Sequence, residues 1–119
     1  MLAVVNQPTY NPNDRSQFSA ERYRNRAVTD IFEPGSSIKP LVIAAALESG
    51  EFRPSSIIDT APGFVTVGAK TIEDRRNLGR VSLTTILARS SNVGVTKLAM
   101  SLQPDQLWQT MTRFGLGSL

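Results

Sequence analysis

The chain has 119 residues, of which 40% are hydrophobic and 19% are charged, proportions ordinary for a globular domain, and its formal net charge is +3. It contains no cysteine and no histidine, which excludes disulfides, thiol catalysis and a Ser-His-Asp triad within the chain and disfavours a metal site. No apolar window reaches the roughly 18 residues of a membrane-spanning helix, and the N-terminus lacks the charged start of a signal peptide.

The N-terminal part of the chain mixes one apolar run with turn-rich and charged segments. The run LAVV at 2–5 predicts a short buried strand, and the Asn-Pro signals that follow it predict a loop. Residues 16–29 are polar and rich in arginine, which favours one helical turn in an otherwise extended segment. Acidic residues alternate with these arginines, so we expect a salt-bridged surface and no nucleic-acid binding.

The middle of the chain predicts a helix, a loop and a hairpin in that order. Apolar periodicity predicts a helix over 40–50 that ends at Gly50. Two prolines and a glycine make 52–63 a loop with a short extended piece. Two alternating runs over 64–74, joined at Gly68 and Ala69, predict a small hairpin.

Three further helices are predicted in the C-terminal part. Ser82 is a natural N-cap for the first, and the second follows the corner 89–92. The third starts at Pro104 and ends before Gly115. The side chains predicted to face the core are Leu83, Ile86, Leu87, Val95, Leu98, Leu102, Leu107, Trp108, Met111 and Phe114. Helices with a few strand pieces make an α+β fold, in one partial domain that occupies residues 1–119.

The stretch EPGSSIKP at 33–40 carries a candidate nucleophile. Ser36 lies three residues before Lys39, an offset that brings two helical side chains to one face, about 5–6 Å apart at Cβ. A desolvated lysine has a lowered pKa, and its neutral amine can then take a proton from a hydroxyl group. The simpler interpretation is a helix cap, and on this motif alone capping is favoured.

The stretch ARSSNVG at 88–94 lies between two predicted helices. A serine or asparagine at this corner can cap the second helix. Alternatively, Ser90 can relay a proton between the lysine and a leaving amine, while Asn92 holds a substrate amide and the lysine in place. The residues themselves leave both interpretations open.

Taken together, these motifs resemble the Ser-x-x-Lys and Ser-x-Asn motifs of the penicillin-binding transpeptidases. The flanking segments are similar to the class B septal enzymes of the penicillin-binding protein 3 type in Gram-negative bacteria. They extend from about residue 2 to 117 and read NQPTYNPN, RNRAVTDIFEPGS, SSNVGVTKLA and RFGLG. The resemblance implies the helix-rich portion of the transpeptidase fold shared with β-lactamases, with an incomplete central antiparallel sheet.

The resemblance also implies roles for four residues. Ser36 would be the acylated nucleophile, Lys39 its general base, Ser90 a proton shuttle and Asn92 a substrate-orienting residue. The substrate would be a D-Ala-D-Ala stem peptide of peptidoglycan, cross-linked to a neighbouring stem, and β-lactams would acylate the same serine. No metal or organic cofactor is implied. The full-length parent would act with cell-division proteins at the periplasmic face of the inner membrane.

The sequence departs from the family in two places. Ser37 stands where the family often has threonine, which keeps the hydroxyl. No Lys-Thr/Ser-Gly motif is present, and we expect it beyond residue 119, together with most of the sheet, so that the chain alone would show feeble or no turnover.

Two alternatives remain. One is a serine β-lactamase-like hydrolase, for which Glu73 or Asp74 would have to activate water, although nothing in the sequence places them beside Ser36. The other is a non-catalytic scaffold or interaction fragment in which both serine motifs are only caps.

Overall fold

The structure is a computed structural model that describes residues 3–117 and divides into two units, with the boundary between Glu33 and Pro34. The first unit contains a 3-10 turn, η1 (Arg15–Gln17), and two single-turn helices, α1 (Ala20–Tyr23) and α2 (Arg26–Thr29). Neither of these α-helices buries a residue. Two helical turns therefore occur in the arginine-rich segment for which one was predicted.

The buried strand predicted at 2–5 is wrong for its described residues. Residues 3–5 have no regular structure and their side chains are exposed, whereas residue 2 lies outside the described part of the chain. A strand is stabilised through the hydrogen bonds of a neighbouring strand. The described sheets contain only segments of the second unit, so the apolar run has no partner among them.

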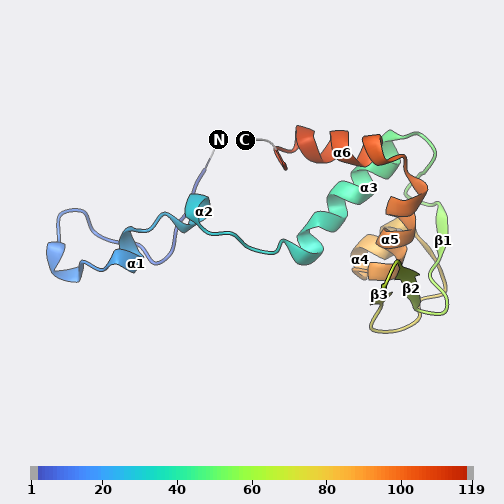
Figure 1. Ribbon diagram of the computed structural model, residues 1–119, viewed down its shortest axis with the longest axis horizontal. Helices are drawn as coiled ribbons and strands as arrows, with labels where there is room; N and C mark the ends of the chain where they lie inside the picture. Colours follow the sequence, from blue (N-terminus) through green and yellow to red (C-terminus); the bar gives the residue numbers. More distant parts are fainter. Residues whose placement is uncertain (1–2, 118–119) are drawn as a thin grey trace. The chain divides into compact units, whose positions relative to one another are not determined.

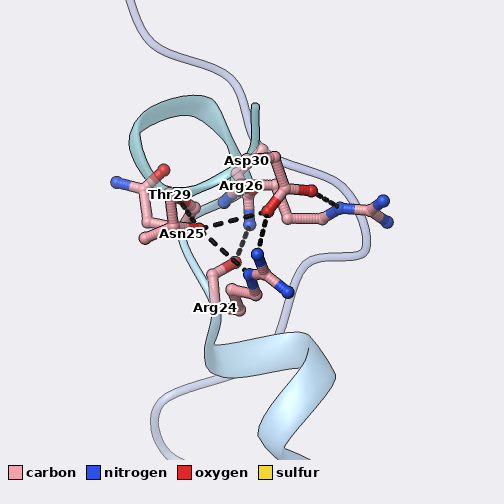
Figure 2. Close-up of polar contacts among 6 residues, drawn as sticks. Arg24, Asn25, Arg26, Thr29 and Asp30 are labelled. Atoms are coloured by element: carbon pink, nitrogen blue, oxygen red, sulfur yellow. Dashed lines mark hydrogen bonds and ion pairs between the residues drawn. The ribbon is translucent and has the colours of Figure 1, made fainter. Parts of the chain in front are cut away.

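Polar contacts organise the end of the first unit. The Asp30 carboxylate pairs with Arg24 at 2.7 Å and with Arg26 at 2.8 Å (Figure 2). The Asn6 side chain donates to the Arg24 carbonyl and accepts from the Arg26 amide, at 3.0 and 2.9 Å. The salt-bridged surface predicted for this segment is confirmed, although exposed pairs of this kind contribute little to stability.

The second unit combines four α-helices with two small antiparallel sheets, which confirms the α+β prediction (Figure 1). A 3-10 turn, η2 (Gly35–Ile38), leads into α3 (Lys39–Glu48), and the other helices are α4 (Leu83–Ala88), α5 (Asn92–Ser101) and α6 (Pro104–Arg113). The hairpin of β2 (Phe64–Val67) and β3 (Lys70–Glu73) turns at Gly68 and Ala69, as predicted. The extended piece predicted in the loop is β1 (Ile57–Asp59), and it pairs with β4 (Arg80–Ser82), which was not predicted.

The core of the second unit lies where α3 packs against α4, α5 and α6. Its buried side chains are Val42, Ile43, Ala45, Ala46, Leu83, Ile86, Val95, Leu98 and Leu102. Five of the ten predicted core side chains are among them. Strands β1, β2 and β3 contact α5, so this helix lies against strands of both sheets as well as against α3 and α4.

Part of the core prediction is wrong. Leu87, Trp108 and Phe114 are 41%, 60% and 63% exposed, whereas Leu107 and Met111 do pack against the core. For Trp108 the reason is the helical period: Leu107 and Met111 are four residues apart and share one face of α6, from which Trp108 is rotated by about 100°. Phe114 is the C-cap residue that follows this helix. The apolar contact of α6 with the core is made by this face, whereas Arg113 pairs with Glu48 of α3. Within residues 3–117, none of the helices has the length and apolar character needed to cross a membrane.

Candidate active site

Ser36 lies in the short turn that precedes α3. Gly35 opens this turn with φ +53°, a left-handed conformation that glycine adopts at little cost. In a 3-10 turn, side chains three residues apart eclipse each other, so Ser36 and Lys39 share a face. Neither η2 nor α3 has a side-chain cap, and the Ser37 hydroxyl donates to the Pro34 carbonyl at 2.7 Å. The serines of this turn therefore do not cap the helix.

Lys39 is a buried lysine in the middle of the site. It is only 7% exposed, and its Nζ donates three hydrogen bonds to the corner between α4 and α5. The acceptors are the Ser90 carbonyl at 2.6 Å, Ser90 Oγ at 2.9 Å and Asn92 Oδ1 at 2.6 Å. Burial lowers the pKa of Lys39, and the nearby negative charge of Asp74 partly opposes that shift.

Ser90 joins the lysine to the candidate nucleophile. Its Oγ donates to Ser36 Oγ at 3.2 Å and accepts from Lys39 Nζ, whereas no direct hydrogen bond joins Ser36 to Lys39 in the described part of the chain. Ser90 has φ +54°, a left-handed backbone that is uncommon for a residue with a Cβ. Such strain persists where the surroundings hold it, and it occurs often at active sites.

The neighbouring residues of the corner have different tasks. Ser91 is the N-cap of α5, and its hydroxyl accepts from the Gly94 amide at 2.8 Å. Asn92 is the first residue of α5, and its amide group is held at both ends, by Lys39 and by the Glu73 carbonyl at 2.9 Å. The cap predicted at this corner is therefore confirmed for Ser91 alone. Ser90 and Asn92 are directed toward Lys39.

Asp74 belongs to the site, which sequence reasoning did not establish. Its carboxylate accepts from Ser91 Oγ at 2.6 Å and from the backbone amides of Asn92 and Val93 at 2.5 and 3.1 Å. Both carboxylate oxygens are thus occupied by donors of the corner. The signal that could have pointed to Asp74 is its place directly after the predicted hairpin, but only the packing of β3 against α5 brings it to the corner.

These groups share one cavity of about 660 Å³, a volume in the range of small-molecule sites. All four residues predicted from the sequence line it, and so does Asp74. Its other charged lining residues are Arg75, Arg76 and Arg89, so the cavity is strongly cationic. No group of three or more metal-ligating side chains occurs within residues 3–117. The arrangement offers a hydroxyl, a bridging hydroxyl, a buried amine and an amide, which together are suited to acyl transfer.

Comparison with known proteins gives matches along the whole chain. Residues 1–119 match the family described as the penicillin binding protein transpeptidase domain. Peptidoglycan D,D-transpeptidase FtsI of Escherichia coli K12 is 44% identical over 117 residues, which cover 98% of this chain and 20% of that protein. Probable peptidoglycan D,D-transpeptidase PbpC of Pseudomonas aeruginosa is 42% identical over 118 residues, 99% of this chain and 21% of that protein.

Solved structures agree with these matches. The apo transpeptidase domain of penicillin-binding protein 3 from Burkholderia pseudomallei superposes with a TM-score of 0.74 at 36% identity, over 79% of this chain and 28% of that one. Penicillin-binding protein A of Mycobacterium tuberculosis, in a ceftriaxone acyl-enzyme complex, gives a TM-score of 0.79 at 26% identity, over 98% of this chain and 31% of that one. The chain spans about a fifth of the length of the curated relatives it matches.

Proposed function

The chain belongs to the penicillin-binding protein transpeptidase domain family, and on this premise we propose that it carries the acyl-transfer site of a peptidoglycan D,D-transpeptidase. The family predicted from the motifs is thereby confirmed, whereas the residue roles remain part of the proposal. One observation carries it: a continuous hydrogen-bond path runs from Ser36 through Ser90 to Lys39 and on to Asn92, inside one cavity.

In the proposed acylation, Ser36 Oγ attacks the carbonyl carbon of the D-Ala-D-Ala amide and forms a C–O bond. The Ser36 proton passes to Ser90 Oγ, which releases its own proton to the neutral Nζ of Lys39. The burial that lowers the pKa of Lys39 increases the population of this neutral amine. When the tetrahedral intermediate collapses, the C–N bond breaks. Lys39 then returns a proton through Ser90 to the departing D-alanine amine.

The second half of the reaction uses the same groups in reverse. An amine of a neighbouring stem peptide attacks the ester carbon and loses a proton through Ser90 to Lys39. The bond to Ser36 Oγ breaks, and the proton returns to that oxygen. Because Lys39 and Glu73 hold the Asn92 amide group at both ends, one N–H of its NH₂ remains for a substrate carbonyl. Asn92 thus orients the substrate and the base together.

The finer assignments follow from this proposal. We place the chain in a larger transpeptidase domain of a septal enzyme that acts with cell-division proteins at the periplasmic face of the inner membrane. β-Lactams acylate Ser36 in the same way as the stem peptide does, and no metal takes part. The support is the identity to FtsI over 98% of the chain and the similarity to a structure solved as a ceftriaxone acyl-enzyme.

The hydrolase alternative needs a carboxylate that is free to activate water. Asp74 does line the cavity, but donors from the corner occupy both of its oxygens. Glu73 does not line the cavity, and its contact with the corner is made by its backbone carbonyl. Neither residue is therefore arranged as a water-activating base. Hydrolysis of many nitrocefin molecules per protein molecule would instead support the hydrolase alternative.

Fluorescent penicillin tests the proposal in the intact protein that carries this chain. We expect one adduct per molecule, located at Ser36 by peptide mass spectrometry, and no adduct in Ser36→Ala. Ser37→Ala is the matched control, because this neighbouring hydroxyl is bound to the Pro34 carbonyl and should leave labelling intact. An intact protein that fails to label, or a label that persists in Ser36→Ala, contradicts the proposed function. Strong stoichiometric labelling of the 119-residue chain alone contradicts the need for a larger domain.

A further inference from the structure

We propose that Asp74 is a positioning residue of the acyl-transfer site, because its carboxylate fixes the corner that holds Ser90 and Asn92 against Lys39. The inference rests on the proposed function and adds a residue outside the two motifs. Asp74 donates nothing to the substrate and takes no proton in the reaction. It acts through the corner and through the charge it places in the cavity.

The contacts of Asp74 converge on one turn of the chain. One oxygen accepts from the backbone amides of Asn92 and Val93, and the other accepts from Ser91 Oγ. Ser91 is 1% exposed, so the loss of Asp74 would leave the proton of a buried hydroxyl without this acceptor, although the oxygen still accepts from Gly94. The two amides lie in the first turn of α5, where backbone donors lack helical partners and a negative charge is stabilised.

The hairpin supplies this carboxylate from a fixed position. Asp74 directly follows β3, and its amide donates to the Gly63 carbonyl at 2.9 Å. The preceding residue, Glu73, accepts from the Asn92 side chain. The end of the hairpin therefore holds the corner at two adjacent residues, once through a carbonyl and once through a carboxylate. This connection accounts for the left-handed backbone of Ser90, the residue whose hydroxyl is directed at Ser36.

Asp74 also affects the charge state of the base. The charged groups that line the cavity with Lys39 are Asp74, Arg75, Arg76 and Arg89, so Asp74 is the one anion among them. Its charge raises the pKa of Lys39 against the effect of burial. An asparagine at position 74 keeps the shape and can accept from the two amides, but it lacks the charge. The pKa of Lys39 should then fall further, and the neutral base should persist to lower pH.

Three variants of the intact protein separate these effects. Asp74→Ala removes both the acceptor and the charge, and Asp74→Asn removes only the charge. Asp59→Ala is the matched control, because Asp59 also accepts from a backbone amide near a strand end, that of Ala61 at 2.8 Å, but does not line the cavity. The readouts are the rate of acylation by fluorescent penicillin as a function of pH, the melting temperature, and the rate at which acetic anhydride modifies Lys39.

We expect Asp74→Ala to acylate ~10- to 100-fold more slowly, as misplacement of reacting groups by an ångström can do, while Asp59→Ala acylates at the wild-type rate. Asp74→Asn should retain most of the rate at high pH, shift the acid limb of the profile to lower pH and make Lys39 more reactive toward the anhydride near neutral pH. Wild-type rates in a folded Asp74→Ala protein overturn the proposal. An acid limb and an anhydride reactivity that are both unchanged in Asp74→Asn also overturn the proposal. These two measurements decide the question if Asp74→Ala does not fold.

The outcomes also distinguish this inference from the proposed function. Absence of labelling in the wild-type protein overturns both, whereas a labelled wild type with unaffected variants overturns this inference alone.

Discussion

The two serine-bearing turns of the second unit have similar sequences and different structures. Each places two adjacent serines at the start of a helix, at Ser36 and Ser37 before α3 and at Ser90 and Ser91 before α5. In the first turn neither hydroxyl caps the helix. In the second turn Ser91 caps α5, and its neighbour Ser90 faces the cavity.

The difference shows how a hydroxyl becomes available for chemistry. A capping hydroxyl is held at the helix end by a backbone amide, and because Ser91 also donates its proton to Asp74, it has no donor left for a substrate. The first turn avoids this conflict because η2 runs directly into α3, which leaves no side-chain cap at the start of that helix. In the second turn one serine, Ser91, caps the helix, and the adjacent Ser90 is left to face the cavity. Lys39 connects the two turns through its three hydrogen bonds to the corner.

Replacement of Lys39 should break the connection between the turns and have the largest effect. Lys39→Met keeps a flexible apolar stem in a buried position but removes the base. Loss of a general base costs ~10²- to 10⁴-fold in rate, so we expect acylation to fall by that factor while the protein remains folded. The measurement is the rate of labelling by fluorescent penicillin, with the melting temperature recorded for each variant.

Lys97→Met is the matched control for this replacement. The Nζ of Lys97 also donates to backbone carbonyls, those of Asp59 at 2.7 Å and Ala61 at 3.3 Å, but Lys97 does not line the cavity. It should leave acylation unchanged. In the wild type the rate should rise with pH along a limb that lies below the ordinary lysine range, because burial lowers the pKa of Lys39 and the deprotonated amine is the base. A Lys39→Met protein that labels at the wild-type rate contradicts the role of Lys39.

The connection between the turns was only partly predictable from the sequence. The three-residue offset places Ser36 and Lys39 on one face, and this local relation follows from helical geometry. That Ser90 and Asn92 meet Lys39 more than 50 residues away rested on the family resemblance. Asp74 could not be assigned, because its partners are backbone amides and one serine hydroxyl, and these leave no pattern in the chain.

The length of a periodic segment and the presence of a neighbouring element separate the fold predictions that were right from those that were wrong. The helices and the hairpin were predicted because their periodicity extends over several residues, as in α3 and α5. β4 has three residues, too few for a period, and it exists through its pairing with β1. The described part of the apolar run, residues 3–5, and the indole of Trp108 were wrongly assigned to buried positions. Apolar character shows what a residue can bury, but the neighbouring element decides whether it does.

Alanine replacements of Ser90 and Ser91 should separate an effect on the acylation rate from an effect on stability. Ser90→Ala removes the bridge between Ser36 and Lys39, so acylation should fall ~10- to 100-fold with little change in melting temperature. Ser91→Ala removes the N-cap and the partner of Asp74, so the free energy of unfolding should fall by ~1–2 kcal/mol. Labelling rates and thermal unfolding of both variants measure the two effects. Equal losses of rate and stability in both would show that the two serines do not differ in task.

Glycine replacements should distinguish the packing of the two turns through stability alone, without a direct effect on the acyl-transfer groups. A Cβ at Gly94 would lie 2.7 and 2.8 Å from Ile86 Cγ1 and Cδ1 and 2.9 Å from Ser91 Oγ. Ile86 is fully buried and cannot move aside, so Gly94→Ala should cost ~1–3 kcal/mol of unfolding free energy. A Cβ at Gly35 would meet nothing within 4 Å, and Gly35→Ala should cost only the ~1 kcal/mol of a left-handed backbone.

Asparagine separates the two causes at these positions. Because asparagine tolerates a left-handed backbone better than alanine does, Gly35→Asn should recover part of the stability that Gly35→Ala loses. Gly94→Asn should be worse than Gly94→Ala, because the larger side chain meets the same buried isoleucine. Thermal unfolding of the four variants measures this opposite order. If the asparagine variant is more stable than the alanine variant at both positions, or less stable at both, the two turns do not differ in packing. Tight packing would then not explain how the corner orients Ser90.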